Sequence, residues 1–128
     1  MRMKIEYEEG GRPLEFENAN ECIELIREIE SEALSPKGVC IYNSKGESLS
    51  CVLAAANTFL VYCPSNYTGV GSFSSLGGSK LENLDYWFCD HHSEACGENL
   101  VSKEILNSVI TDFLDNGGLS KYIGWVAD

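Results

Sequence analysis

The sequence predicts an α+β fold: an antiparallel-rich sheet with two helices packed on one face, in a single compact domain. Two segments, one towards each end, have helical hydrophobic periodicity, and the stretch between them is typical of short strands separated by turns. Of the 128 residues, 44% are hydrophobic and 23% are charged, which is usual for one globular domain. No internal repeat, low-complexity tract or linker divides the sequence, so residues 1–128 are expected to form one domain.

A β-hairpin is expected first. Apolar and charged side chains alternate over residues 3–7, which is the period of a half-buried strand. Gly10 and Gly11 supply a turn, and residues 13–17 form the returning strand.

The first helix follows directly. Asn18 is a candidate N-cap, and Glu21 stands three residues later, as in a capping box. The apolar positions recur at helical spacing, at Cys22, Leu25, Ile26, Ile29 and Ala33. Pro36 is expected to end the helix, because proline lacks the backbone N–H that a helix interior needs.

The middle of the chain is predicted to be β-structure. The expected strands are residues 39–42, 49–53, 58–63, a short stretch near Phe73 and residues 84–89. Residues 58–63 are apolar at successive positions, which is typical of a central strand covered on both faces. Residues 65–80 are rich in Ser, Gly and Asn and are otherwise expected to form a loop.

The last part is predicted as a polar loop over residues 90–99, a helix and a strand. Ser102 is the expected N-cap of this second helix, and Gly117 with Gly118 the C-terminal cap. Its inner face contains Leu106, Val109, Ile110 and Phe113. Residues 122–126 read as a short terminal strand.

The charge is strongly negative and unevenly distributed. Twenty acidic against nine basic residues give a formal net charge of −11. Residues 1–35 carry −6, residues 36–80 carry +2 and residues 81–128 carry −7. Phosphate backbones and anionic lipids should repel such a chain, so neither nucleic acid nor a membrane is expected as partner. A basic protein is the expected partner, although acidic surfaces also serve solubility alone.

The expected location is the cytoplasm. No stretch approaches the roughly 18 apolar residues of a membrane span. The first residues lack the apolar core of a signal peptide. Of the six cysteines, Cys22, Cys51 and Cys63 fall in apolar segments, where a reduced thiol behaves as a small hydrophobe.

Catalytic motifs are not evident, and neither enzymatic activity nor a cofactor is expected. The glycines at 69 and 71 do not complete a dinucleotide fingerprint, and no serine lies in a nucleophile elbow. One alternative remains, a zinc site formed by Cys89, His91 and Cys96, because thiolates and imidazoles are preferred zinc ligands. Against it, the usual two-residue cysteine spacing is missing. A cysteine nucleophile is disfavoured because neighbouring acids would raise its pKa.

The remaining functional candidate is a partner-binding surface. Aromatic anchors surrounded by acidic side chains are typical of a tight interface with a basic protein. The candidate residues are Tyr67, Asp85, Trp87, Asp90, Glu94, Glu98, Asp112 and Asp115. Trp87 could instead be an ordinary core residue.

Three segments resemble immunity protein family 1 of bacterial polymorphic toxin systems. They are the aromatic, serine and glycine stretch Phe73-Ser74-Ser75-Leu76-Gly77-Gly78, then residues 84–88 followed by a polar loop and Leu100-Val101, and finally Phe113-Leu114-Asp115-Asn116-Gly117 followed by Ile123-Gly124-Trp125. The resemblance spans residues 38–127 and depends on the order and spacing of these segments. The chain departs from the family where a proline often precedes the last helix, since Ser102 stands there.

The resemblance implies an α+β antidote in the bacterial cytoplasm. Such a protein binds and neutralises, in a 1:1 complex, the C-terminal toxin domain of a protein encoded beside it. The toxins are often nucleases or deaminases that attack nucleic acids, and a basic cleft in such a toxin suits an acidic inhibitor. Two alternatives stay open: a small zinc-binding protein, and an adaptor or chaperone for a secreted effector.

Overall fold

The computed structural model describes residues 2–8, 10–65, 71–77 and 81–128. Its helices are α1 (Ala19–Glu32) and α2 (Leu106–Asn116), with short 3₁₀ turns η1 (Gly97–Asn99) and η2 (Lys103–Ile105). The strands are β1 (Lys4–Glu6), β2 (Leu14–Glu15), β3 (Lys37–Tyr42), β4 (Ser48–Leu53), β5 (Asn57–Phe59), β6 (Val61–Cys63), β7 (Phe73–Leu76), β8 (Leu84–Phe88), β9 (His91–Ala95), β10 (Leu100–Ser102) and β11 (Gly124–Ala127).

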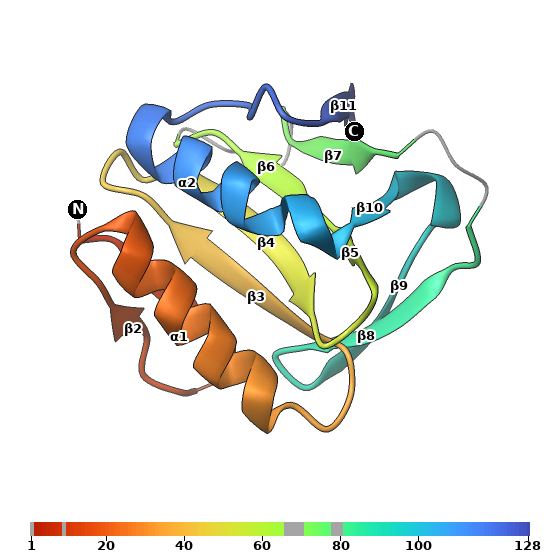
Figure 1. Cartoon of the computed structure of the whole chain (residues 1–128), viewed down its shortest axis with the longest axis horizontal. Helices are drawn as coiled ribbons and strands as arrows, with labels where there is room; N and C mark the ends of the chain where they lie inside the picture. Colours follow the sequence, from red (N-terminus) through yellow and green to blue (C-terminus); the bar gives the residue numbers. More distant parts are fainter. Residues whose placement is uncertain (1, 9, 66–70, 78–80) are drawn as a thin grey trace.

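The main sheet has the strand order β11-β7-β6-β4-β3-β1-β2, and each neighbouring pair in it is antiparallel. Strand β8 joins β3 in parallel through one pair, Lys37 with Trp87, and β9 pairs with β8. Strands β5 and β10 form a separate two-stranded sheet. Both helices lie across the same face of the main sheet (Figure 1). The predicted α+β fold is confirmed.

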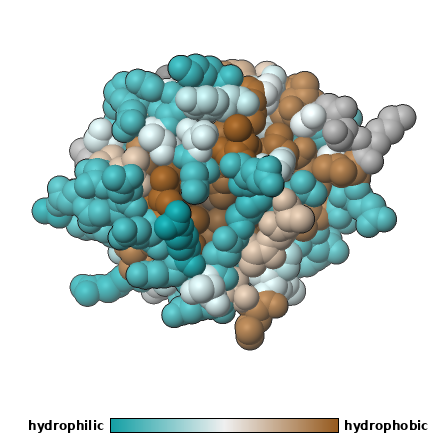
Figure 2. All heavy atoms as spheres, in the orientation of Figure 1, coloured by the Kyte–Doolittle hydropathy of each residue, from teal (hydrophilic) through white to brown (hydrophobic). Residues whose placement is uncertain are grey.

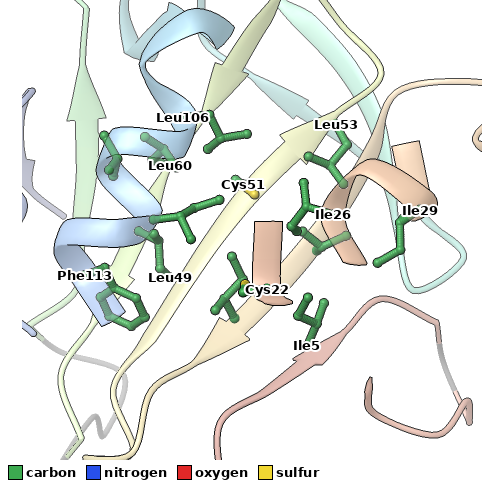
Figure 3. Close-up of a cluster of buried hydrophobic side chains, with 14 of the residues drawn as sticks. Ile5, Cys22, Ile26, Ile29, Leu49, Cys51, Leu53, Leu60, Leu106 and Phe113 are labelled. Atoms are coloured by element: carbon green, nitrogen blue, oxygen red, sulfur yellow. The ribbon is translucent and has the colours of Figure 1, made fainter. Parts of the chain in front are cut away.

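The core fills the space between the sheet and the two helices. Helix α1 contributes Cys22, Ile26 and Ile29, and α2 contributes Leu106, Val109, Ile110 and Phe113, as the periodicity predicted. They meet inward side chains of the central strands, among them Leu49, Cys51 and Leu53 (Figure 3). The predicted N-cap of α1 and the predicted C-terminal cap of α2 are present. Asn18 Oδ1 accepts from the Glu21 N–H at 3.0 Å, and Gly117 ends α2 with φ of 71°. The prediction of Ser102 as the N-cap of α2 is wrong, because Ser102 caps η2 and α2 begins after Ile105 without a side-chain cap.

Residues 58–63 do not form the single central strand that was predicted. The segment is interrupted at Leu60, which lies between β5 and β6. The Leu60 N–H donates to Ser75 Oγ at 3.0 Å, and its carbonyl accepts from the Ser75 N–H at 2.8 Å. These bonds join Leu60 to β7. On either side of Leu60, β6 pairs within the main sheet and β5 pairs with β10.

The prediction of a loop over residues 90–99 is also wrong. Residues 91–95 form β9, which pairs with β8 along its whole length. The chain reverses at Cys89 and Asp90, whose φ angles are 48° and 65°. Positive φ at both central residues is what a type I′ hairpin turn requires, and it is usually met by Asn-Gly. Because neither turn residue is glycine and His91-His92-Ser93-Glu94 lacks apolar alternation, the sequence carried no hairpin signal.

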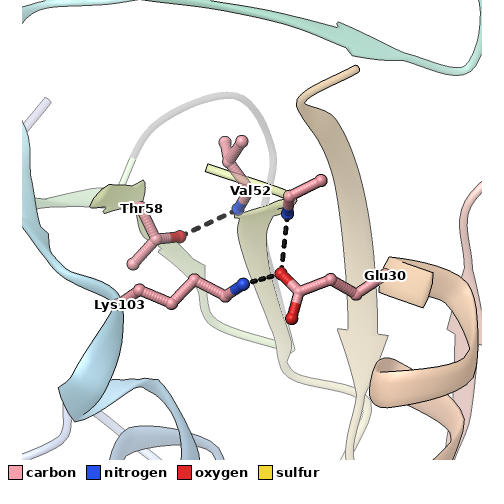
Figure 4. A network of polar contacts seen from close by, with 5 residues as sticks. Glu30, Val52, Thr58 and Lys103 are labelled. Carbon is pink, nitrogen blue, oxygen red and sulfur yellow. Dashed lines mark hydrogen bonds and ion pairs between the residues drawn. The ribbon is translucent and has the colours of Figure 1, made fainter. Parts of the chain in front are cut away.

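The end of α1 is fixed by a polar clamp (Figure 4). Helix α1 ends at Glu32, four residues before Pro36. Glu30 Oε2 accepts from the Ala54 N–H at 2.7 Å and forms an ion pair with Lys103 at the start of η2. One carboxylate thereby joins α1, the β4–β5 turn and the segment leading into α2. Ser102 caps η2 by accepting from the Glu104 N–H at 3.3 Å, and α2 follows directly.

Candidate protein-binding surface

The β8–β9 hairpin is anchored to the sheet by its inner face. The Phe88 ring lies against the backbone of Gly38, where any larger side chain would collide with it. The Trp87 N–H donates to the Pro36 carbonyl at 3.0 Å, next to the Lys37–Trp87 pair. Tyr86 is half-buried on the same inner face, and burial raises the pKa of its hydroxyl. The hairpin is therefore positioned by packing against β3.

The outer face of the hairpin carries charged and aromatic side chains. Successive residues of a strand alternate between faces, and directly paired residues share one. The outer face accordingly consists of the pairs Asp85–Glu94 and Trp87–His92. All four side chains are exposed, and Trp87 retains 49% of its accessible surface. A tryptophan this open on a folded surface is available to a partner.

Contacts within this outer face order the side chains. The Trp87 and His92 rings meet edge to face, with centroids 5.4 Å apart. His92 Nε2 lies 3.5 Å from Asp85 Oδ1, and Asn83 Nδ2 donates to Glu94 Oε1 at 3.2 Å. Two carboxylates directly opposite each other on neighbouring strands repel and cost stability. The contacts with His92 and Asn83 hold Asp85 and Glu94 side by side in spite of their like charge.

A groove of about 510 Å³ separates the hairpin tip from the end of α1. Its lining includes Glu8, Glu32, Leu34, Trp87 and Asp90, which come from three separate parts of the chain. Leu34 is fully exposed, and it is the most open large apolar side chain in the described residues. Sequence reasoning did not identify Leu34 or His92. For Leu34 a signal existed, because this leucine falls outside the helical pattern of the apolar residues that precede it.

The other predicted interface residues do not join this surface. Glu98 is exposed in η1, beyond the end of β9. Asp112 and Asp115 lie in the last turns of α2, at the upper left of Figure 1, whereas the hairpin lies at the lower right. Asp112 accepts from Asn116 Nδ2 at 2.7 Å, which lowers the pKa of its carboxyl group. Tyr67 lies outside the described residues.

The geometry does not support the zinc alternative. Cys89 is in the hairpin turn and Cys96 follows the far end of β9, so the extended strand holds them roughly 15–20 Å apart. Zinc ligands must all lie about 2.0–2.3 Å from one ion. Cys89, His91 and Cys96 therefore cannot share an ion, and no group of three or more His, Cys, Asp or Glu residues in the described parts of the chain is arranged to hold a metal.

A second pocket, of about 300 Å³ and open to solvent, lies between the inner side of the hairpin and β4, β5 and β6. Its walls include Phe59, Val61, Tyr86 and Phe88. This pocket is largely apolar, whereas the outer face and the groove combine apolar and acidic groups. The latter combination is the one that selects a partner by charge.

Comparison with known proteins assigns no family. No protein-family model matches the chain, and a search of curated proteins finds no match. Across the described residues, neither helix has the length and apolar content needed to cross a lipid bilayer.

Proposed function

We propose that this protein is a bacterial immunity protein that binds and neutralises a basic toxin domain in the cytoplasm, as a 1:1 complex and without catalytic activity of its own. The observation that carries the proposal is the outer face of the β8–β9 hairpin, where Asp85 and Glu94 face each other beside the half-exposed Trp87. The resemblance of residues 38–127 to immunity protein family 1 supports the same function.

The chemistry of the hairpin suits a basic partner. A cationic side chain placed between Asp85 and Glu94 would relieve the repulsion between the two carboxylates, so binding gains energy that the free protein lacks. Trp87 offers a large apolar surface next to that charge, and tryptophan is enriched among the residues that dominate binding energy. A nuclease or deaminase is the toxin class that fits, because its nucleic-acid cleft is basic.

The test uses the C-terminal domain encoded by the gene immediately upstream of this one. Calorimetry should give tight 1:1 binding, and addition of this protein should abolish the toxic activity of that domain. Binding without inhibition would identify an adaptor or chaperone instead. No binding would overturn the proposal.

A pair of charge reversals locates the interface. Glu94→Lys should weaken binding about tenfold or more, because a close charge pair across an interface couples by roughly 1.5 kcal/mol or more. Asp115→Lys makes the same charge change on an exposed position of α2 and should leave binding unchanged. If only Asp115→Lys weakened binding, the interface would lie on α2 and the hairpin assignment would be wrong.

A further inference from the structure

We infer that the groove between α1 and the hairpin tip receives an apolar side chain from a basic segment of the partner. The inference rests on the proposed function and extends it, because it adds a second element to the interface and defines what the partner must present. The groove occupies about 510 Å³ and lies next to the outer face of the hairpin, with Trp87 belonging to both.

Two exposed apolar side chains line the groove. Leu34 is fully exposed just after α1, and Trp87 is 49% exposed on β8. A single exposed leucine on a protein surface is ordinary. Two large apolar side chains that line one groove, from segments far apart in the sequence, are the arrangement found at interaction sites. Figure 2 shows a hydrophobic protrusion at the lower margin of a face on which hydrophilic and hydrophobic side chains are mixed.

The charge of the lining determines the kind of partner. Glu8, Glu32 and Asp90 bring three carboxylates to the groove, and Lys37 is the one basic residue in its lining. Lys37 Nζ lies 3.5 Å from Glu8 Oε1 and 4.9 Å from the centre of the Tyr7 ring, so its charge is already engaged within the protein. The net effect is negative, which repels nucleic acid and anionic lipid and favours arginine or lysine beside the inserted apolar side chain.

The groove is formed before binding. The Glu30 clamp holds the last turn of α1 against the Ala54 N–H and Lys103, and the bond from the Trp87 N–H to the Pro36 carbonyl holds the hairpin against the chain that leaves α1. A preorganised site loses little conformational entropy on binding, so apolar contacts inside it act mainly by slowing dissociation. Acidic groups at the rim act mainly on the association rate.

The test compares two identical substitutions in the full chain, measured by surface plasmon resonance against the upstream-encoded toxin domain. Leu34→Asp should weaken binding by about 30-fold or more, mostly through faster dissociation, as expected for an apolar anchor. Leu119→Asp is the matched control, because Leu119 is also exposed, at 41%, and lies beyond the end of α2. Leu34→Met should retain binding within about threefold, since it keeps an apolar side chain of similar size.

The outcomes separate this inference from the proposed function. If Leu34→Asp bound like the wild type while Glu94→Lys bound weakly, the groove assignment would be overturned and the immunity function would stand. Equal losses for Leu34→Asp and Leu119→Asp would also overturn it, because the effect would then not belong to the groove. If the wild-type protein failed to bind, both would fall. Leu34→Asp should not affect folding, because the native side chain is fully exposed, and urea unfolding checks this.

Discussion

Glu47 connects the β3–β4 turn with the end of α2. Its carboxylate accepts hydrogen bonds from the Tyr62 hydroxyl, from Asn43 Nδ2 at 2.8 Å and from the Gly118 N–H at 3.3 Å. Burial alone would raise the pKa of Glu47, but these hydrogen bonds outweigh burial and hold the pKa below its ordinary value. The ionised form is therefore the one that the folded protein stabilises.

Glu47→Gln should lower the free energy of unfolding by about 1–2 kcal/mol at pH 7, because hydrogen bonds to a charged acceptor are replaced by weaker ones. The depressed pKa makes this contribution complete above the unfolded carboxyl pKa of about 4.3 and removes it as the pH falls through the folded pKa. The difference between wild type and variant in urea unfolding should hence shrink at pH 3. Glu24→Gln, at an exposed position of α1, should show no such dependence. An equal difference at both pH values would contradict the assignment.

The cysteines should differ sharply in reactivity. Cys22 and Cys51 are buried in the core, and burial raises the pKa of both thiols, that of Cys22 to about 12. Cys96 is exposed. Because the thiolate is the reactive form, iodoacetamide should label Cys96 in the native protein and Cys22 and Cys51 only after unfolding. Peptide mapping by mass spectrometry measures this, and native labelling of Cys51 would contradict the packing of β4 against α1.

At the scale of elements, the hairpin turn is predicted to favour glycine. Asp90 has φ of 65°, a conformation in which a side chain with a β-carbon is strained. Asp90→Gly and Asp90→Ala remove the same charge, so their difference isolates the backbone effect. The Gly variant should be more stable than the Ala variant by about 1 kcal/mol, as judged by urea unfolding. In an ordinary strand or helix the order would be reversed, and a more stable Ala variant would show that the turn is not left-handed.

The elements that the sequence predicted correctly are those with a periodic apolar face and a recognisable cap. Helix α1 combines Asn18 as cap with buried positions at helical spacing, and α2 ends at Gly117 as predicted. The errors have a different physical origin. Strand β9 is polar on both faces, and the break at Leu60 depends on hydrogen bonds to Ser75, which is distant in the sequence. Local pattern cannot reveal an element that tertiary hydrogen bonds create.

The candidate surface could also be predicted only in part from the sequence. Asp85 and Trp87 could be placed on one face because β8 was recognised as a strand, and alternation then follows. To predict that Glu94 and His92 lie opposite them, one would need to know that β9 exists and how it pairs with β8. The groove could not be predicted from the sequence, because it forms only where the folded chain brings the end of α1 beside the hairpin tip. Asp112 and Asp115, which were predicted to belong to the same surface, lie on α2 instead. Net charge thus gave the expectation of a basic partner, whereas the fold was needed to find which carboxylates lie side by side.

At the scale of the whole molecule, the formal charge of −11 should govern how fast a basic partner arrives. Opposite net charges attract the two proteins towards each other before they touch, and salt weakens this long-range attraction. The Debye length is about 8 Å at physiological ionic strength and about 3 Å at 1 M. The short-range contacts proposed for Leu34 and Trp87 would act after the encounter and would be screened far less.

The association rate with the upstream-encoded toxin domain should therefore fall about tenfold or more between 50 mM and 500 mM sodium chloride. The dissociation rate should change by no more than about threefold, because apolar contacts in the groove dominate it. Stopped-flow fluorescence measures the first rate and surface plasmon resonance the second. Glu94→Lys should reduce the salt dependence of association, whereas Leu34→Asp should leave that dependence intact and speed dissociation. An association rate indifferent to salt would mean that the acidic surface serves solubility and not recognition.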